Sequence, residues 1–251
     1  MNICINTSSI SHLASGENIG FEQALVKCLE KGVKNLELDE SNSGGRERVL
    51  QLFNEVRNNG GSIAVLNLKL NLLGGDVKSN EKYLNDVKNW IKFCGENGCR
   101  VLRLSATPVS GEKYSEKDFK LLYRNLLNIL SSAEKNNVEI SISTDKEAYS
   151  NMDRLAAMIE DIGSETIGLT LDLESLSKLD EKMLEKLVPL VNHVTVSEAC
   201  LENGEKNFVE KVFKTLKTNA YGGYVSLQLN KSCTLEEFCS YLDKIRRMIS
   251  P

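Results

Sequence analysis

The sequence is poor in histidine, tryptophan and proline, and it contains no long apolar segment. Among 251 residues there are 2 His, 1 Trp and 3 Pro. Nowhere do about 18 apolar residues follow one another, so no transmembrane helix is expected. The N-terminal stretch MNICINTSS lacks the basic and apolar regions of a signal peptide. We therefore expect a cytoplasmic protein with no membrane partner.

The sequence also lacks an excess of positive charge and any CxxC pair of cysteines. The formal net charge is -4 and the sequence pI is about 5.5, so the chain exerts no long-range attraction on phosphate backbones, and no nucleic-acid partner is expected. The 7 cysteines are odd in number, and the pairs Cys94/Cys99 and Cys233/Cys239 do not have zinc-hook spacing. We interpret most of them as small buried side chains in a reducing compartment.

What the sequence does contain is a regular alternation of short apolar runs and helical patterns. Hydrophobic residues make up 41% and charged residues 26% of the chain, which is ordinary for a globular protein. Runs of β-branched and apolar residues predict eight strands, over residues 2–6, 33–38, 62–68, 99–105, 138–143, 167–172, 193–198 and 223–229. Two capping boxes, Ser115 with Asp118 and Thr234 with Glu237, predict the starts of two long helices.

Eight strand–helix units are the number needed for a closed barrel. An open dinucleotide-binding sheet would need a glycine-rich turn after the first strand, and NTSSISHLASG has none. The predicted fold is therefore α/β, a single (β/α)8 TIM barrel with eight parallel strands and outer helices, in one domain over residues 1–251.

In such barrels the active site lies at the C-terminal ends of the strands. The candidate site is therefore formed by the polar side chains near these ends, namely Asn6, Glu37, Asn67, Arg103, Ser143, Asp172, Thr195, Glu198 and Gln228. Few of these groups titrate near neutral pH.

The last four strands, within residues 136–145, 166–175, 192–200 and 222–230, support a more specific comparison. Their order and endings resemble the xylose isomerase-like barrels, which comprise sugar and sugar-phosphate isomerases and epimerases together with the type IV AP endonucleases. In that family the fifth strand ends in a metal-binding Glu, the sixth carries Asp-x-x-His, the seventh His-x-His with an acidic signature, and the eighth ends in a second Glu. The resemblance implies a divalent-metal site in which the two Glu also transfer protons.

This sequence departs from the family pattern at most of those positions. Matched to the motifs, Ser143 and Gln228 stand where the two Glu are expected, and Thr195 stands at the metal-binding His. Asp172 is retained, whereas Ser175 replaces the His of Asp-x-x-His. Neutral oxygens are weak ligands for Mg²⁺ or Mn²⁺, so no cofactor is expected. Residual binding of these ions would have to go through Asp172.

The retained charged residues have several interpretations. Asp172 is a remnant metal ligand, a general base, or one half of a buried ion pair with Arg103. We expect the ion pair, because a buried carboxylate without a metal needs a compensating charge. His193 and Glu198 match the first His and the acid of the seventh-strand motif, and we interpret His193 as a structural hydrogen-bonding residue at the start of its strand.

Two hypotheses about function follow from these residues. The first is a divergent sugar or sugar-phosphate isomerase or epimerase that lacks most metal ligands and transfers protons with Asp172, Glu37 or Glu198. In it, Asn6, Asn67, Arg103, Ser143, Thr195 and Gln228 bind a small carbohydrate-like substrate. The second is a non-catalytic barrel that binds a carbohydrate or a protein partner. Whether the chain is an enzyme stays open, and a homo-oligomer is compatible with either hypothesis; nuclease action is not expected with 2 His and a net negative charge.

Overall fold

The eight strands of the chain form one closed, all-parallel barrel. The structure is a computed structural model that describes residues 1–250 apart from 41–44, 75–79, 109–113, 144–150, 177–179 and 203–205. Each strand pairs with the next along the chain, and β8 closes the barrel against β1. The strands are β1 Asn2–Asn6, β2 Asn35–Asp39, β3 Ser62–Asn71, β4 Val101–Ser105, β5 Glu139–Ser143, β6 Ile167–Asp172, β7 Val191–Ser197 and β8 Tyr224–Gln228. The predicted (β/α)8 TIM barrel is therefore confirmed.

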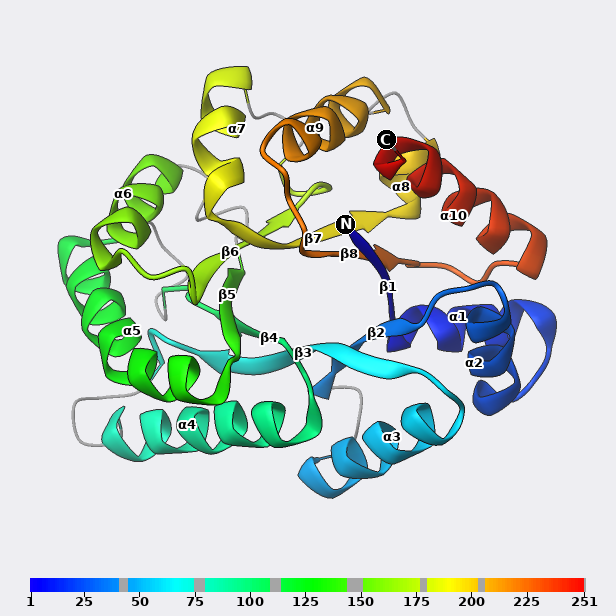
Figure 1. Ribbon diagram of the computed structural model, residues 1–251, viewed down its shortest axis with the longest axis horizontal. Coiled ribbons are helices and arrows are strands. Elements are labelled where there is room, and N and C mark those ends of the chain that lie inside the picture. Colours follow the sequence, from blue (N-terminus) through cyan, green and yellow to red (C-terminus); the bar gives the residue numbers. More distant parts are fainter. Residues whose placement is uncertain are drawn as a thin grey trace.

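Helices surround the barrel as an outer layer (Figure 1). They are α1 Thr7–Glu17, α2 Phe21–Glu30, α3 Arg46–Asn58, α4 Asn80–Asn97, α5 Glu116–Asn136, α6 Met152–Ile162, α7 Glu181–Leu187, α8 Glu198–Glu202, α9 Lys206–Thr218 and α10 Leu235–Ile249. Both predicted capping boxes are confirmed at α5 and α10. None of the described helices is long and apolar enough to cross a membrane.

The sequence patterns did not predict helix α1, helix α8 or the last three residues of strand β3. Helix α1 follows β1 directly and begins at a cap in which Asn6 Oδ1 accepts a hydrogen bond from the Ser8 amide at 2.9 Å. Its serine-rich sequence has little helical propensity. Tertiary contact fixes the helix, since a Cβ at Gly16 would lie 2.0 Å from the Cys233 carbonyl oxygen. Helix α8 begins at Glu198, which was predicted to be strand. Strand β3 continues to Asn71, three residues beyond the predicted end at residue 68.

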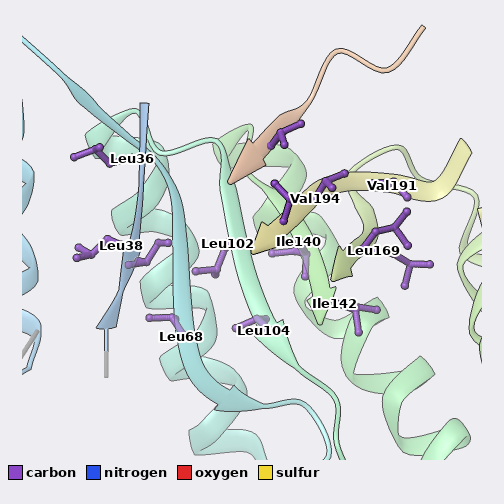
Figure 2. Close-up of a cluster of buried hydrophobic side chains, with 14 of the residues drawn as sticks. Leu36, Leu38, Leu68, Leu102, Leu104, Ile140, Ile142, Leu169, Val191 and Val194 are labelled. Atoms are coloured by element: carbon purple, nitrogen blue, oxygen red, sulfur yellow. The ribbon is translucent and has the colours of Figure 1, made fainter. Parts of the chain in front are cut away.

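The two faces of each strand have different surroundings. Side chains that point away from the barrel axis pack against the helices in one large apolar core, and Figure 2 shows several of them on neighbouring strands, among them Leu102, Leu104, Ile140 and Ile142. The residues between them alternate to the inside of the barrel. Toward the N-terminal ends of the strands this interior is apolar, with Cys4, Ala64, Val65 and Val101 in a separate small cluster. Polar residues fill the interior nearer the C-terminal ends.

Candidate active site

An arginine and a glutamate are paired inside the barrel, beneath the C-terminal ends of the strands. Arg103 projects from β4 and donates a hydrogen bond from Nη1 to Glu37 Oε1 of β2 at 3.1 Å. Its Nε donates to Ser143 Oγ at the end of β5 at 2.7 Å. Glu37 is fully buried, whereas the Arg103 side chain is 13% exposed. The guanidinium therefore connects three strands and remains in contact with the mouth of the barrel.

A histidine continues this polar arrangement on the other side of Glu37. His193 is completely buried, and its Nε2 lies 3.7 Å from Glu37 Oε2 and 2.9 Å from Ser226 Oγ. Its Nδ1 lies 3.4 Å from Thr170 Oγ1, which in turn shares a hydrogen bond of 2.6 Å with Ser141 Oγ. Strand β7 begins earlier than predicted, at Val191, so His193 lies within the strand. The barrel centre is thus a hydrogen-bonded cluster built from β2, β4, β5, β6, β7 and β8.

The charge states in this cluster follow from burial and from neighbouring charges. Burial lowers the pKa of His193 to about 4, while the Glu37 carboxylate opposes and Arg103 reinforces this change. For Glu37, burial by itself raises the pKa, but His193, when it is protonated, and the Arg103 guanidinium lower it below its ordinary value overall. At neutral pH the histidine is therefore neutral, and Arg103 is the cation that balances the Glu37 carboxylate.

The expected ion pair between Asp172 and Arg103 is not present, and the prediction was wrong. Asp172 Oδ1 accepts a hydrogen bond from the Glu174 amide at 3.2 Å, and Oδ2 accepts one from Ser175 Oγ at 2.9 Å. Arg103 instead pairs with Glu37, which comes from the first half of the chain and is fully buried. Asp172 is partly exposed at the end of β6, and both of these partners are neutral.

Glu198 serves a structural role between the segments that follow β7 and β8. It is 3% exposed and begins α8, and its two carboxylate oxygens accept hydrogen bonds from the Asn230 amide at 2.9 and 3.0 Å. The bond joins the segment after β7 to the segment after β8. A carboxylate held in this way has its acceptor sites directed at the backbone rather than at a ligand.

The remaining predicted residues lie at the strand ends, as expected, but with different degrees of exposure. Asn67, Ser143 and Gln228 are partly exposed at the C-terminal halves of their strands, whereas Asn6 and Thr195 are buried. Strand register places Thr195 opposite Asp172 and opposite Ser226. The Thr195 hydroxyl has no hydrogen-bond partner among the described residues. The Asn6 side chain caps α1, which leaves its amide nitrogen as the group able to face a ligand.

The side chains at the mouth of the barrel are a poor set of ligands for a divalent metal ion. Near the end of β6, Asp172 is surrounded by neutral hydroxyl and amide groups, and its own oxygens already accept hydrogen bonds. Within the described ranges there is no group of three or more His, Cys, Asp or Glu side chains that could hold a metal ion. Mg²⁺ and Mn²⁺ need several anionic oxygens to offset the loss of their hydration shell.

Sequence reasoning did not identify the lower members of the cluster, Ser141, Thr170 and Ser226. Each lies between two apolar residues of a strand, within EISIS, IGLTLD and YVSLQ. This alternation was the available signal, since it turns these hydroxyls to the inside of the barrel once the leucines and isoleucines pack outward.

Comparisons with known proteins place this architecture in one family. A family sequence model described as "Xylose isomerase-like TIM barrel" matches residues 20–248. No curated protein matches the chain.

Solved structures resemble the whole chain despite low sequence identity. A D-psicose 3-epimerase with D-tagatose from Clostridium cellulolyticum H10 has a TM-score of 0.77 at 11% identity, with 100% of both chains covered. A xylose isomerase-like TIM-barrel protein from Mycobacterium smegmatis in complex with magnesium has a TM-score of 0.70 at 16% identity, with 99% of this chain and 98% of that chain covered. An IolI protein with a bound zinc atom has a TM-score of 0.75 at 14% identity, with 100% of this chain and 98% of that chain covered. At these identities the likeness establishes a shared fold.

Proposed function

The chain belongs to the xylose isomerase-like TIM-barrel family, and on that basis we propose that the mouth of its barrel binds a small carbohydrate-like ligand without a divalent ion. One observation carries this proposal. Arg103 is fixed by Glu37 and Ser143, yet its Nη2 amino group has no hydrogen-bond partner among the described residues. The guanidinium is thus a preorganised donor for a carbonyl or hydroxyl oxygen.

The groups around Arg103 suit a ligand with many hydroxyl groups. Asn67 is paired in register with Arg103, and Asn67, Gln228 and Asp172 are partly exposed toward the C-terminal ends of β3, β8 and β6, where they offer both donors and acceptors. Carbohydrates are recognised through such hydrogen bonds, because each hydroxyl group can donate one bond and accept others. Loss of one such bond costs about 0.5–1.5 kcal/mol, which weakens binding by about 2- to 10-fold.

Ligand titration tests this proposal directly. The purified chain, treated with EDTA, is titrated with D-fructose, D-tagatose and D-psicose by calorimetry and saturation-transfer NMR. Asn67→Ala should weaken binding by about 2- to 10-fold, whereas Asn128→Ala, on the exposed surface of α5, should leave it unchanged. Equal affinities for the two variants, or no binding of any of the three sugars, would contradict the proposal.

A second proposal concerns proton transfer by Asp172. Its carboxylate is partly exposed at the mouth and is hydrogen-bonded to neutral donors alone among the described residues. A carboxylate in this position can remove the proton from a carbon next to a sugar carbonyl group, which is the first step of an epimerisation or isomerisation. Glu37 and Glu198 fit this role less well, because both are buried whereas Asp172 is partly exposed.

Hydrogen exchange with the solvent separates catalysis from binding. In D2O with EDTA, deuterium should enter the sugar at the carbon next to the carbonyl group, and Asp172→Asn should abolish this exchange. Asp153→Asn, on the exposed surface of α6, is the matched control. Binding without any exchange would identify a non-catalytic barrel, and exchange that requires added Mn²⁺ would contradict the metal-free mechanism. A protein-binding role has less support, since the exposed large hydrophobic residues in the described ranges are Leu50 and Leu127, on different helices.

A further inference from the structure

The ion pair between Glu37 and Arg103 neutralises the positive charge that faces the mouth of the barrel. The two groups are 3.1 Å apart, and Glu37 is fully buried whereas the Arg103 side chain is 13% exposed. Because solvent cannot screen a buried carboxylate well, its negative charge extends to any ligand that Arg103 contacts. The arginine therefore offers hydrogen-bond donors without a net positive charge.

Other charged groups near the mouth do not reverse this balance. In the part of the chain that the structure describes, three carboxylates come from β2 and β6 at this end of the barrel, those of Glu37, Asp39 and Asp172. Two cations come from β4 and β3, those of Arg103 and Lys69. His193 adds no charge at neutral pH, because burial lowers its pKa to about 4. An anionic ligand group would thus lose its hydration shell without gaining an uncompensated cation, which is unfavourable.

We infer that Glu37 is a specificity-determining residue that restricts the site to neutral polyhydroxylated ligands and excludes sugar phosphates and sugar acids. The inference rests on the proposed carbohydrate site at the mouth and names its ligand class. Glu37 itself is buried beneath Arg103 and acts through the charge and orientation of the guanidinium, not through contact with the ligand.

Removal of the Glu37 charge should change which ligands bind. Glu37→Gln keeps an oxygen for Arg103 Nη1 but leaves the guanidinium charge uncompensated. Wild type and variant are titrated with two matched pairs of probes, D-fructose with D-fructose 6-phosphate and D-glucose with D-gluconate. A unit charge about 8 Å away, at an effective dielectric constant near 20, changes the ratio of anionic to neutral affinity by about tenfold or more. The control is Glu139→Gln, which removes a carboxylate paired with Arg100 at 3.8 Å, at the start of β5.

The outcomes distinguish this inference from the proposed function. Preference of the wild type for neutral probes, with a tenfold shift toward anionic probes in Glu37→Gln and none in Glu139→Gln, supports the inference. Tighter binding of the phosphate or the gluconate by the wild type would overturn the inference and leave the carbohydrate site intact. Failure of all four probes to bind would overturn both. If Glu37→Gln does not fold, the wild-type preference and its independence of salt concentration decide the question.

Discussion

The outer face of the barrel strands is held by apolar packing and the inner face by hydrogen bonds and charge pairing, although residues of the two faces alternate along the same short sequences. On β4, Leu102 and Leu104 face the helices, and Arg103 between them faces the barrel axis. On β5, Ile140 and Ile142 alternate in the same way with Ser141 and Ser143. The outer face needs apolar volume and no particular partner, whereas most buried polar groups of the inner face have a specific hydrogen-bond partner. The outer face thus packs the barrel against its helices, and the inner face holds the polar groups that can select a ligand.

This division explains why the inner cluster is connected across the barrel. Glu37, Arg103 and His193 come from β2, β4 and β7, and each is bonded or close to another member. An uncompensated buried charge costs several kcal/mol, so the members stabilise the fold as a set. Removing one member should therefore have a larger effect than removing an apolar side chain of the outer face.

The strongest test of that difference is Arg103→Ala. This variant leaves the Glu37 carboxylate buried without its cation, and we expect a loss of about 3–5 kcal/mol in the free energy of unfolding. Urea denaturation at pH 7 measures the change. A double variant, Arg103→Met with Glu37→Leu, should recover most of the loss, because it also removes the buried charge. A loss below about 1 kcal/mol for the single variant would show that the pair is not a structural unit.

On the outer face, Leu102→Ala should destabilise the fold by about 3 kcal/mol, through lost burial and the cavity left between β4 and the helices. Leu102 is completely buried, whereas Leu127, on α5, is 44% exposed. Leu127→Ala is the matched control and should change the free energy of unfolding by less than about 0.5 kcal/mol. Equal effects in the same urea titration would mean that the core between the strands and the helices is not as tightly packed as described.

The buried histidine gives the inner face a pH dependence that the outer face cannot have. The folded-state pKa of His193 is about 4, below its ordinary value of 6.5, so the unfolded chain takes up a proton that the folded chain does not. Stability should therefore fall as the pH is lowered from 6.5 to 4, by about 2–3 kcal/mol. Glu37, whose pKa is lowered in the fold, adds a further loss at the acidic end of this range.

Denaturant titrations at several pH values test this dependence. His193→Gln should flatten the decrease in stability between pH 6.5 and 4, whereas His12→Gln, on α1, should retain it. The same slope in His193→Gln as in the wild type would assign the pH dependence to other groups.

The smallest expected effect distinguishes two hydroxyl groups on neighbouring strands. Thr195 Oγ1 is buried without a partner among the described residues, whereas Thr170 Oγ1 is bonded to Ser141 and lies 3.4 Å from His193 Nδ1. Thr195→Val should change stability by less than about 0.5 kcal/mol or increase it, and Thr170→Val should cost about 1–2 kcal/mol. Thermal unfolding detects the difference. A similar loss in both variants would indicate a bonded partner for Thr195, such as an ordered water molecule.

Much of the architecture could be predicted because it depends on local patterns. The β-branched runs identified all eight strands, and the capping boxes of α5 and α10 marked helix starts, since both signals are periodic or short-range. Helix α1 was missed, because its sequence favours a helix weakly and its position depends on the distant backbone of Cys233. The low helical propensity of α1 is offset by tertiary contacts, which a pattern in the local sequence cannot reveal.

The sequence by itself determined the barrel and the polar nature of its mouth, since strand alternation and strand endings are local properties. The pairing of charges was decided by tertiary structure alone. Glu37 and Arg103 are separated by 66 positions in the chain, and they meet because β2 and β4 curve around one axis. Asp172, which lies closer to the family pattern, turned out to bond with its own loop. The balance of charge in the site, and with it the inferred preference for neutral ligands, depends on distances that only the closed barrel sets.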